Sequence, residues 1–289
     1  MKVRATRTLP GPAWAELGDV AIAPADEAGP DVEILIVTNE PVDLGLYPSL
    51  RLIANYSVGY DRIDVAGAAA RGIAVSNTPG VLDAATADLA IALMLAVRRG
   101  VVAGDRMIRA GEWGSHWAGP PFLGHDVSGT TLGIVGLGRI GSAVARRAAG
   151  FDMRVLSVRH SEGDLDVMLP ECDIVSLHVP LSAQTHGLMT RGRLALLKDG
   201  ATLVNTARGE IVDEDALVAE LVSGRISAGL DVFAHEPSVP AALFDLPNVV
   251  MTPHIGSGTI ETRAAMTRVV VDNVLAFEHG KPLLTPVTQ

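Results

Sequence analysis

A glycine-rich turn between an apolar strand and a helix constrains this chain more than any other feature. Residues 131–141 read TLGIVGLGRIG, and the SAVARRAAG that follows has a helical pattern. In such a turn the first glycine, Gly136, permits a tight bend and the second, Gly138, lets the backbone approach a pyrophosphate. The third, Gly141, allows close packing of helix on strand, and the helix N-terminus adds amide donors. The segment therefore predicts a dinucleotide site; the alternative is a glycine turn that serves packing alone.

Apolar runs alternate with helical stretches along most of the chain. Runs rich in Ile, Leu and Val predict strands on both sides of the glycine turn, beginning with residues 31–38, 50–56 and 72–78. Residues 82–110 form a long apolar helical pattern, interrupted at residues 98–100, and a last long helix ends at Gly280. Strand–helix alternation of this kind predicts an α/β fold with parallel sheets.

The composition excludes several classes of protein and site. A formal net charge of −10 argues against a nucleic-acid or anionic-membrane surface. The single cysteine, Cys172, excludes a disulfide within the chain and a thiolate metal cluster. The N-terminus lacks the apolar core of a signal peptide, and the longest apolar run contains Asp88 and is too short to span a bilayer. We therefore expect a cytoplasmic protein with no metal site and no nucleic-acid or membrane partner.

The second strand after the glycine turn ends in an arginine. The stretch VLSVRHS closes with Arg159, His160 and Ser161, where such folds usually carry an Asp or Glu that binds the ribose. A carboxylate there repels a 2′-phosphate, whereas a guanidinium offers donors that fit one. Arg159, with His160 and Ser161 as further donors, therefore favours NADP(H) over NAD(H), which remains a second candidate. The alternative is a solvated arginine, with Glu162 or Asp164 serving the ribose instead.

Reactive side chains follow three later strands of the predicted sheet. They are Arg208 in NTARGE, Asp231 and Glu236 in LDVFAHEP, and His254 in MTPHIGSGT. Ligands bind at the carboxyl ends of strands in doubly wound sheets, so we expect these side chains in one crevice. An arginine can hold a substrate carboxylate and polarise a ketone oxygen, and a histidine can donate a proton to that oxygen as a hydride arrives. A neighbouring glutamate favours the protonated histidine, so the set suits the reduction of a 2-oxo acid.

Each of these residues also has a purely structural interpretation. Glu236 can be a turn residue, and Arg208 can be an ion-pair partner. Three other histidines, His178, His186 and His235, also lie near predicted strand ends or loops. No single member of the set therefore predicts catalysis by itself.

Long stretches of the sequence resemble the D-2-hydroxyacid dehydrogenases, nearest the glyoxylate/hydroxypyruvate reductases. The matching segments follow the family's order and cover most of residues 50–265; they are NYSVGYDRIDVAGAAARGIAVSNTPGVLDAATADLAIALML, GEWGSHW, LGIVGLGRIG, DIVSLHVPLSAQTHGLM, LVNTARGEIVDEDAL, AGLDVFAHEP and NVVMTPHIGSGT. The resemblance implies two doubly wound parallel-sheet domains, with a Rossmann cofactor domain inserted in a flavodoxin-like substrate domain. It implies a substrate domain at residues 1–95 plus 260–289 and a dinucleotide-binding domain at 96–259.

The resemblance also implies roles for individual residues. Arg208, Glu236 and His254 would form a catalytic triad, with Arg208 also binding substrate. The backbone amides of Val58 and Gly59 would hold the substrate carboxylate. Cofactor contacts beyond the glycine turn and residues 159–161 would come from Thr86, Arg139, Ile140, Val179, Pro180, Thr185, Thr206, Ala207, Asp231, His254 and Gly256.

Within this cofactor set the resemblance implies a definite distribution. Arg139 and Ile140 would lie at the pyrophosphate, and Thr206 would lie near the ribose and nicotinamide. Asp231 would hold the carboxamide, and Thr86 would lie near the nicotinamide end.

One segment departs from the family pattern, and another is expected to lie near a neighbouring subunit. Residues 161–173 are shorter than usual and lack the strand normally found there. The family pattern also implies a homodimer joined through the cofactor domains. Trp113 and Trp117 would pack in the dimer or the connector, or one would reach a neighbour's active site.

Together these observations predict an NADP-preferring reductase. It would transfer a hydride to the C2 carbonyl of a small 2-oxo acid, glyoxylate or hydroxypyruvate, to give a D-2-hydroxy acid. Two alternatives stay open. One is another activity of the same family, on lactate, phosphoglycerate or phosphite. The other is a non-catalytic, corepressor-like sensor that binds the dinucleotide without consuming it.

Overall fold

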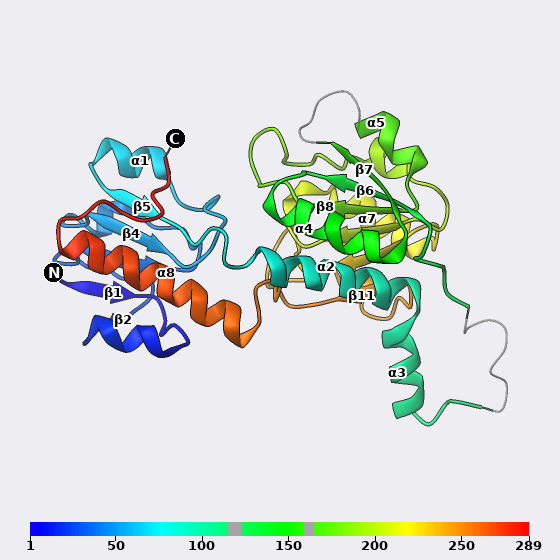
Figure 1. Cartoon of the computed structure of the whole chain (residues 1–289), viewed down its shortest axis with the longest axis horizontal. Helices are drawn as coiled ribbons and strands as arrows, with labels where there is room; N and C mark the ends of the chain where they lie inside the picture. Colours follow the sequence, from blue (N-terminus) through cyan, green and yellow to red (C-terminus); the bar gives the residue numbers. More distant parts are fainter. Residues whose placement is uncertain (115–122, 159–164, 289) are drawn as a thin grey trace. The chain divides into compact units, whose positions relative to one another are not determined.

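The computed structural model describes residues 1–114, 123–158 and 165–288. The chain divides into two compact units, Met1–Leu82 with Ser257–Gln289 and Asp83–Gly256, and each unit has its own sheet (Figure 1). The boundary expected at residue 95 lies inside helix α2 (Asp83–Arg98). This helix belongs to the second unit because its buried residues Ala87, Leu93 and Met94 join the core of that unit.

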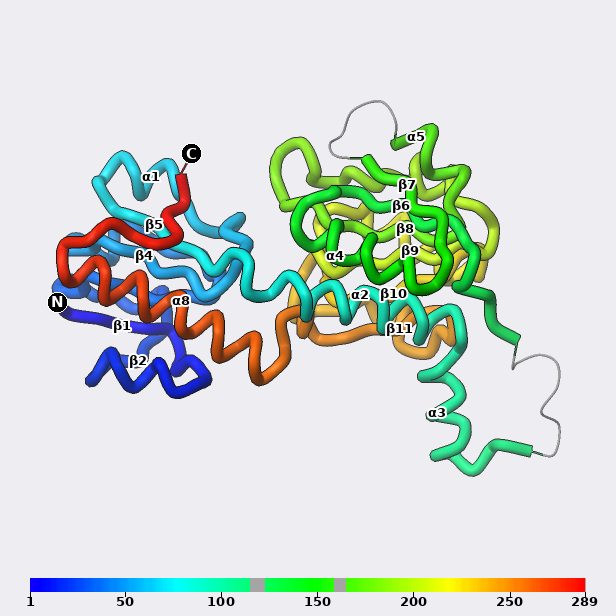
Figure 2. The backbone as a smooth tube through the Cα atoms, viewed as in Figure 1, coloured from blue at the N-terminus to red at the C-terminus, as the bar shows by residue number. Residues whose placement is uncertain are grey.

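The first unit is built on a five-stranded parallel sheet in the order β2-β1-β3-β4-β5. Its strands and α-helices are β1 (Val3–Ala5), β2 (Ala21–Ile22), β3 (Ile34–Val37), β4 (Leu52–Asn55), β5 (Ala74–Ser76), α1 (Val65–Ala70) and α8 (Ile260–Glu278). Every residue of β3 and β4 is buried, as expected for parallel strands covered on both faces. Helix α8, near the C-terminus, lies along this sheet (Figure 2). The Tyr56 hydroxyl donates a hydrogen bond to the Arg263 carbonyl of α8 at 2.9 Å.

The second unit is built on a six-stranded parallel sheet in the order β11-β10-β9-β8-β6-β7. Its strands are β6 (Thr131–Val135), β7 (Arg154–Val158), β8 (Ile174–Leu177), β9 (Thr202–Asn205), β10 (Ser227–Leu230) and β11 (Val249–Met251). Its remaining α-helices are α3 (Val101–Arg109), α4 (Arg139–Ala148), α5 (Leu165–Met168), α6 (Arg191–Ala195) and α7 (Glu214–Val222). This is the order of a doubly wound dinucleotide-binding sheet that stops at β7. Between β7 and β8 the described residues form α5 and a 3-10 turn, and no strand.

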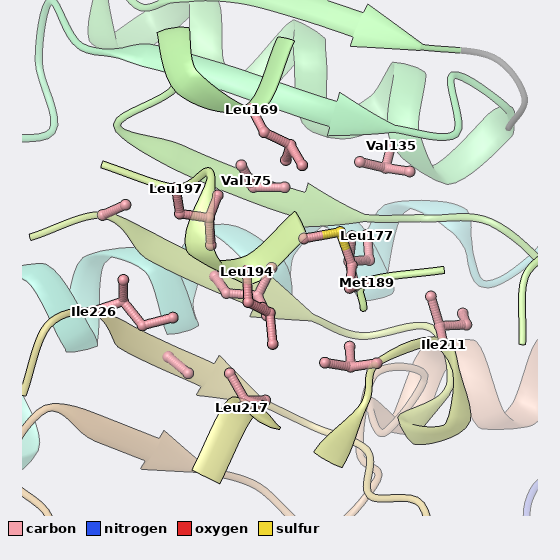
Figure 3. Packing of buried hydrophobic residues seen from close by; sticks show 14 of the residues in the cluster. Val135, Leu169, Val175, Leu177, Met189, Leu194, Leu197, Ile211, Leu217 and Ile226 are labelled. Atoms are coloured by element: carbon pink, nitrogen blue, oxygen red, sulfur yellow. The ribbon is translucent and has the colours of Figure 1, made fainter. Parts of the chain in front are cut away.

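The core of the second unit lies between the sheet and its covering helices. Figure 3 shows Val175 and Leu177 of β8 packed with Leu194 of α6 and Leu217 of α7. These side chains are at most 4% exposed, so the inner strands cannot shift register without exposing the cluster to water. The core therefore holds the carboxyl ends of β8, β9 and β10 in a defined arrangement.

The long apolar stretch of residues 82–110 folds into two helices, α2 and α3. Gly100 adopts φ 59° between α2 and α3, a conformation that glycine reaches without steric cost. Helix α2 is buried along much of its length, whereas no residue of α3 is buried. Among the described residues, no helix is both long enough and apolar enough to cross a membrane.

Candidate active site

The glycine turn joins β6 to α4 as the sequence predicts. Gly136 has φ 99°, and a Cβ there would lie 2.7 Å from the carbonyl carbon of His178. A Cβ on Gly141 would lie 2.1 Å from the Gly136 carbonyl oxygen. Nothing lies within 4 Å of the corresponding position on Gly138, so the backbone at this residue is open to a ligand. Gly136 and Gly141 thus serve the turn and its packing, and Gly138 leaves the backbone open to the approach of a pyrophosphate.

The segment after β8 lies against this turn. Val179 is buried, and one of its methyl groups would lie 2.8 Å from a Cβ on Gly136. The Thr185 hydroxyl donates to the Pro180 carbonyl at 2.5 Å and accepts from the Ser182 amide at 2.9 Å. Thr185 therefore closes the turn that carries Pro180, and its side chain is committed to the protein.

Asn205, at the end of β9, organises the turn that carries Arg208. Its side-chain oxygen accepts from the Ala207 amide at 3.0 Å, and its amide group donates to the Arg208 carbonyl at 2.8 Å. The Arg208 guanidinium donates to the Ala207 carbonyl at 2.7 Å. Asn205 has no recognisable signal in the sequence, because its role depends on the turn that the tertiary structure forms around it.

Thr206 lies in the same turn with an unused donor. Its hydroxyl oxygen is buried and has no hydrogen-bond partner within the described residues. A buried hydroxyl of this kind is costly unless another group satisfies it. Thr206 and the open backbone at Gly138 therefore fit a dinucleotide bound along the ends of these strands.

Glu236 and His254 form a hydrogen-bonded pair. His254 Nδ1 lies 2.8 Å from Glu236 Oε2, and Glu236 Oε1 accepts from the Phe233 amide at 3.1 Å. Burial disfavours the charged carboxylate, but the hydrogen bond and charge of His254, the Phe233 amide and the charge of Arg208 together outweigh it. The pKa of Glu236 therefore lies below its usual value, and the carboxylate stays ionised beside the imidazole at neutral pH.

Asp231 holds the loop that presents His254. Its side chain is buried and accepts hydrogen bonds from the Thr252 hydroxyl at 2.6 Å and from the amides of Ile255 and Gly256 at 2.8 Å each. Its carbonyl accepts from the His254 amide at 2.9 Å. Burial raises the pKa of Asp231, and the three hydrogen bonds oppose that shift. Asp231, predicted as a cofactor residue, thus has a second, structural role that the sequence did not indicate.

The other predicted cofactor residues of the second unit divide into two groups. A Cβ on Gly256 would lie 3.2 Å from an Asp231 carboxylate oxygen and 3.4 Å from the Thr86 methyl group, so these three residues meet. Arg139 and Ile140 form the first turn of α4, directly after Gly138, and Arg139 Nε lies 3.5 Å from an Asp83 carboxylate oxygen.

The remaining predicted site residues lie in the first unit, are exposed, or fall outside the residues that the structure describes. Val58 and Gly59 are in the first unit, after β4. Trp113 is exposed. Arg159, His160, Ser161, Glu162, Asp164 and Trp117 lie outside the described residues. Over residues 1–114, 123–158 and 165–288, no group of three or more His, Cys, Asp and Glu side chains is arranged to hold a metal ion.

Comparison with known proteins assigns the chain to a class. Residues 91–256 match the family model described as D-isomer specific 2-hydroxyacid dehydrogenase, NAD binding domain. The chain belongs to this family of NAD(P)-dependent oxidoreductases, which confirms the resemblance noted in the sequence.

Individual relatives support the same assignment over nearly the whole chain. A glyoxylate reductase of Pyrococcus horikoshii is 47% identical over 271 residues, which cover 87% of this chain and 81% of the relative. A crystal structure of a Thermus thermophilus protein is 43% identical, with a TM-score of 0.90 and all of both chains covered. The NADPH-dependent glyoxylate/hydroxypyruvate reductase of Sinorhizobium meliloti, solved with NADP and malonate, is 36% identical with a TM-score of 0.88. That match covers 100% of this chain and 97% of the relative. The predicted pair of parallel-sheet α/β domains is thereby confirmed.

Proposed function

We propose that this protein reduces a small 2-oxo acid, glyoxylate or hydroxypyruvate, to the corresponding 2-hydroxy acid. The observation that carries the proposal is the His254–Glu236 hydrogen bond of 2.8 Å, with the charge of Arg208 acting on the same carboxylate. The three residues follow β9, β10 and β11, which are neighbours in the dinucleotide-binding sheet. The names of the Pyrococcus horikoshii and Sinorhizobium meliloti relatives support the choice of substrate.

In the proposed reaction each residue has one task. Arg208 and the amides of Val58 and Gly59 hold the substrate carboxylate, and the Arg208 guanidinium polarises the ketone oxygen. A reduced nicotinamide dinucleotide supplies the hydride when bound. His254 donates a proton to the oxygen that becomes the hydroxyl, and the Glu236 carboxylate, 2.8 Å from His254 Nδ1, orients the imidazole for that transfer. In the oxidative direction His254 takes up that proton.

The proposed cofactor is NADP(H), with NAD(H) as a weaker alternative. Arg159, His160 and Ser161 would offer donors to the 2′-phosphate. The strand before them, β7, pairs with β6, and the Val158 carbonyl accepts from the Gly136 amide at 2.8 Å. Val158, which directly precedes Arg159 in the sequence, is thus hydrogen-bonded to the glycine turn. The Sinorhizobium meliloti relative is also named as NADPH-dependent.

We also propose a cytoplasmic homodimer, joined through the second unit. Support comes from α3, which buries none of its residues. Four large apolar side chains on α3 and the connector after it are exposed to solvent: Val101, Ile108, Trp113 and Leu123. Exposed large apolar side chains that cluster on a protein surface are typical of an interface.

Absorbance at 340 nm tests the proposal, with glyoxylate and hydroxypyruvate as substrates and NADPH or NADH as cofactor. The wild type should consume the reduced cofactor with one or both acids, and His254→Asn should lower kcat at least about a hundredfold. Measurable cofactor binding without turnover on these acids, or on pyruvate, would contradict the reductase and favour the dinucleotide sensor.

A further inference from the structure

The loop after β4 presents two backbone amides. In this loop, residues 57–60, the amides of Val58 and Gly59 donate no hydrogen bond to any described residue. Both residues are partly exposed, so water or a ligand can reach their amides. These are the groups to which the proposed function assigns the substrate carboxylate.

The carbonyl groups of the same loop are all occupied. The Asn77 side-chain amide donates to the Val58 carbonyl at 2.9 Å, and the buried Asn55 side chain donates to the Gly59 carbonyl at 2.7 Å. The backbone amide of Thr78 donates to the Ser57 carbonyl at 3.0 Å. The loop is therefore held through its carbonyl groups, and the amides of Val58 and Gly59 remain available to a ligand.

Because peptide groups are planar, the hydrogen bonds to these carbonyls also fix the directions of the Val58 and Gly59 N–H groups. The C=O of Val58 and the N–H of Gly59 belong to one planar trans peptide and point in opposite directions. The bond from Asn77 to the Val58 carbonyl thus turns the Gly59 N–H away from Asn77. In the same way, the hydrogen bond from the Thr78 amide to the Ser57 carbonyl turns the N–H of Val58 away from Thr78.

Asn77 is itself fixed by the end of the chain. Its backbone amide donates to the Thr285 carbonyl at 3.3 Å, and the Thr285 hydroxyl donates to the Asn77 carbonyl at 2.6 Å. The buried Asn273 of α8 donates to the Thr285 hydroxyl at 2.9 Å and accepts from the amides of Leu284 and Thr285. Val287 continues the contact by donating to the Val75 carbonyl of β5 at 2.8 Å. Residues 284–287 thus form a C-terminal strap across Asn77.

We propose that Asn77 is a positioning residue for substrate binding and that the C-terminal strap holds it in place. The Asn77 side chain sets the Val58–Gly59 peptide so that its amide meets the substrate carboxylate, and Thr285 fixes the Asn77 backbone. The inference rests on the proposed function, because that function assigns the carboxylate to these amides. Neither Asn77 nor Thr285 touches the reacting atoms in this proposal.

The first test replaces the Asn77 donor with an acceptor of the same shape. Asn77→Asp should raise the KM for glyoxylate, and the inhibition constant of malonate, by about tenfold. The kcat and the dissociation constant of NADPH should change less than twofold. Asn248→Asp is the matched control, because Asn248 donates to two backbone carbonyls of the second unit, those of Leu221 and Ile226, at 2.9 and 2.8 Å. A merely structural role for Asn77 predicts the same kinetics for both variants at equal loss of stability.

A second pair of variants keeps the inference testable if Asn77→Asp fails to fold. Thr285→Val removes the hydroxyl and should raise the same KM several-fold, whereas Thr285→Ser retains the hydroxyl and should restore it. An unchanged KM in Thr285→Val and Asn77→Asp, with an active wild type, would overturn the inference and leave the proposed function standing. Absence of turnover in the wild type with every 2-oxo acid would overturn both.

Discussion

Gly209 lies directly against the backbone of Phe233: a Cβ atom on Gly209 would be 2.0 Å from the Phe233 carbonyl carbon. The turn after Arg208 thus rests on the loop that leads to Glu236. Glu214 strengthens this contact from α7 by accepting the Ala234 amide at 2.9 Å. The relative position of the arginine and the glutamate therefore depends on a side chain being absent at residue 209.

Gly209→Ala should separate these two loops. The backbone cannot yield as a flexible side chain would, so we expect the free energy of unfolding to fall by about 1–3 kcal/mol. A shift of the Arg208 turn by about 1 Å should lower kcat/KM by about a hundredfold. Urea denaturation and the 340 nm assay measure the two effects. Gly150→Ala is the control, because nothing lies within 4 Å of a Cβ there; equal behaviour of the two variants would contradict the packing argument.

Glu236→Gln should change the pH dependence of reduction. The lowered pKa of Glu236 keeps the wild-type carboxylate charged through the neutral range, so that His254 Nδ1 has a charged hydrogen-bond partner at 2.8 Å there. Protonation of Glu236 removes this charged partner, so reductive kcat/KM of the wild type should decline as the pH falls through the lowered pKa of Glu236, and Glu236→Gln should lack that decline. Glu171→Gln, which alters an exposed ion pair with Arg154 at 3.1 Å, should leave the profile unchanged. The same acid-side decline in Glu236→Gln as in the wild type would show that the glutamate does not act through its charge.

The same shift has a consequence for stability. Because the folded chain lowers the Glu236 pKa, the stabilisation is present above the unfolded-state pKa and is lost as the pH falls through the folded value. Glu236→Gln should remove this acid-sensitive part of the unfolding free energy. Urea denaturation between pH 6 and pH 3 measures it.

His178→Asn should reduce the acid sensitivity of folding. Burial lowers the pKa of His178 from 6.5 to about 4, and its Nε2 lies 2.8 Å from the Ser176 hydroxyl. Between these pH values the unfolded chain binds a proton that the folded chain does not, so stability falls as the pH falls. From pH 7 to pH 5 the wild type should lose about 2 kcal/mol more unfolding free energy than the variant. His186→Asn, at an exposed histidine, should retain the wild-type slope; an equal slope in His178→Asn would contradict the assignment.

Arg159→Asp should reverse the cofactor preference. A carboxylate repels a 2′-phosphate and accepts hydrogen bonds from a ribose diol, so kcat/KM should fall for NADPH and rise for NADH. A combined change in the ratio of about a hundredfold or more corresponds to the loss of a charge-assisted phosphate contact. Arg146→Asp makes the same charge change at an exposed position of α4 and should leave the ratio unaltered. NADH preference in the wild type would exclude a 2′-phosphate site at Arg159 while leaving the reductase intact.

Local patterns in the sequence determined much of the fold. The strand, glycine turn and helix of residues 131–148 were predictable because strand periodicity, tight turns and helix starts depend on neighbouring residues. The break between α2 and α3 was predictable for the same reason, since Gly100 supplies a left-handed conformation there. The domain boundary was less predictable: α2 is apolar on most faces, and only its packing partners show to which unit it belongs.

The site divides in the same way. Arg208, Glu236 and His254 could be identified as candidates because reactive residue types follow predicted strands, whose carboxyl ends meet at one edge of a parallel sheet. Only the tertiary structure decided that Glu236 pairs with His254, that Asp231 holds the histidine loop, and that Gly209 sets the distance between two loops. Asn77 and Thr285, 208 positions apart, show the reason. A hydrogen bond between distant segments leaves no periodic signal in either one, and it exists only because the folded sheet and α8 bring the two segments together.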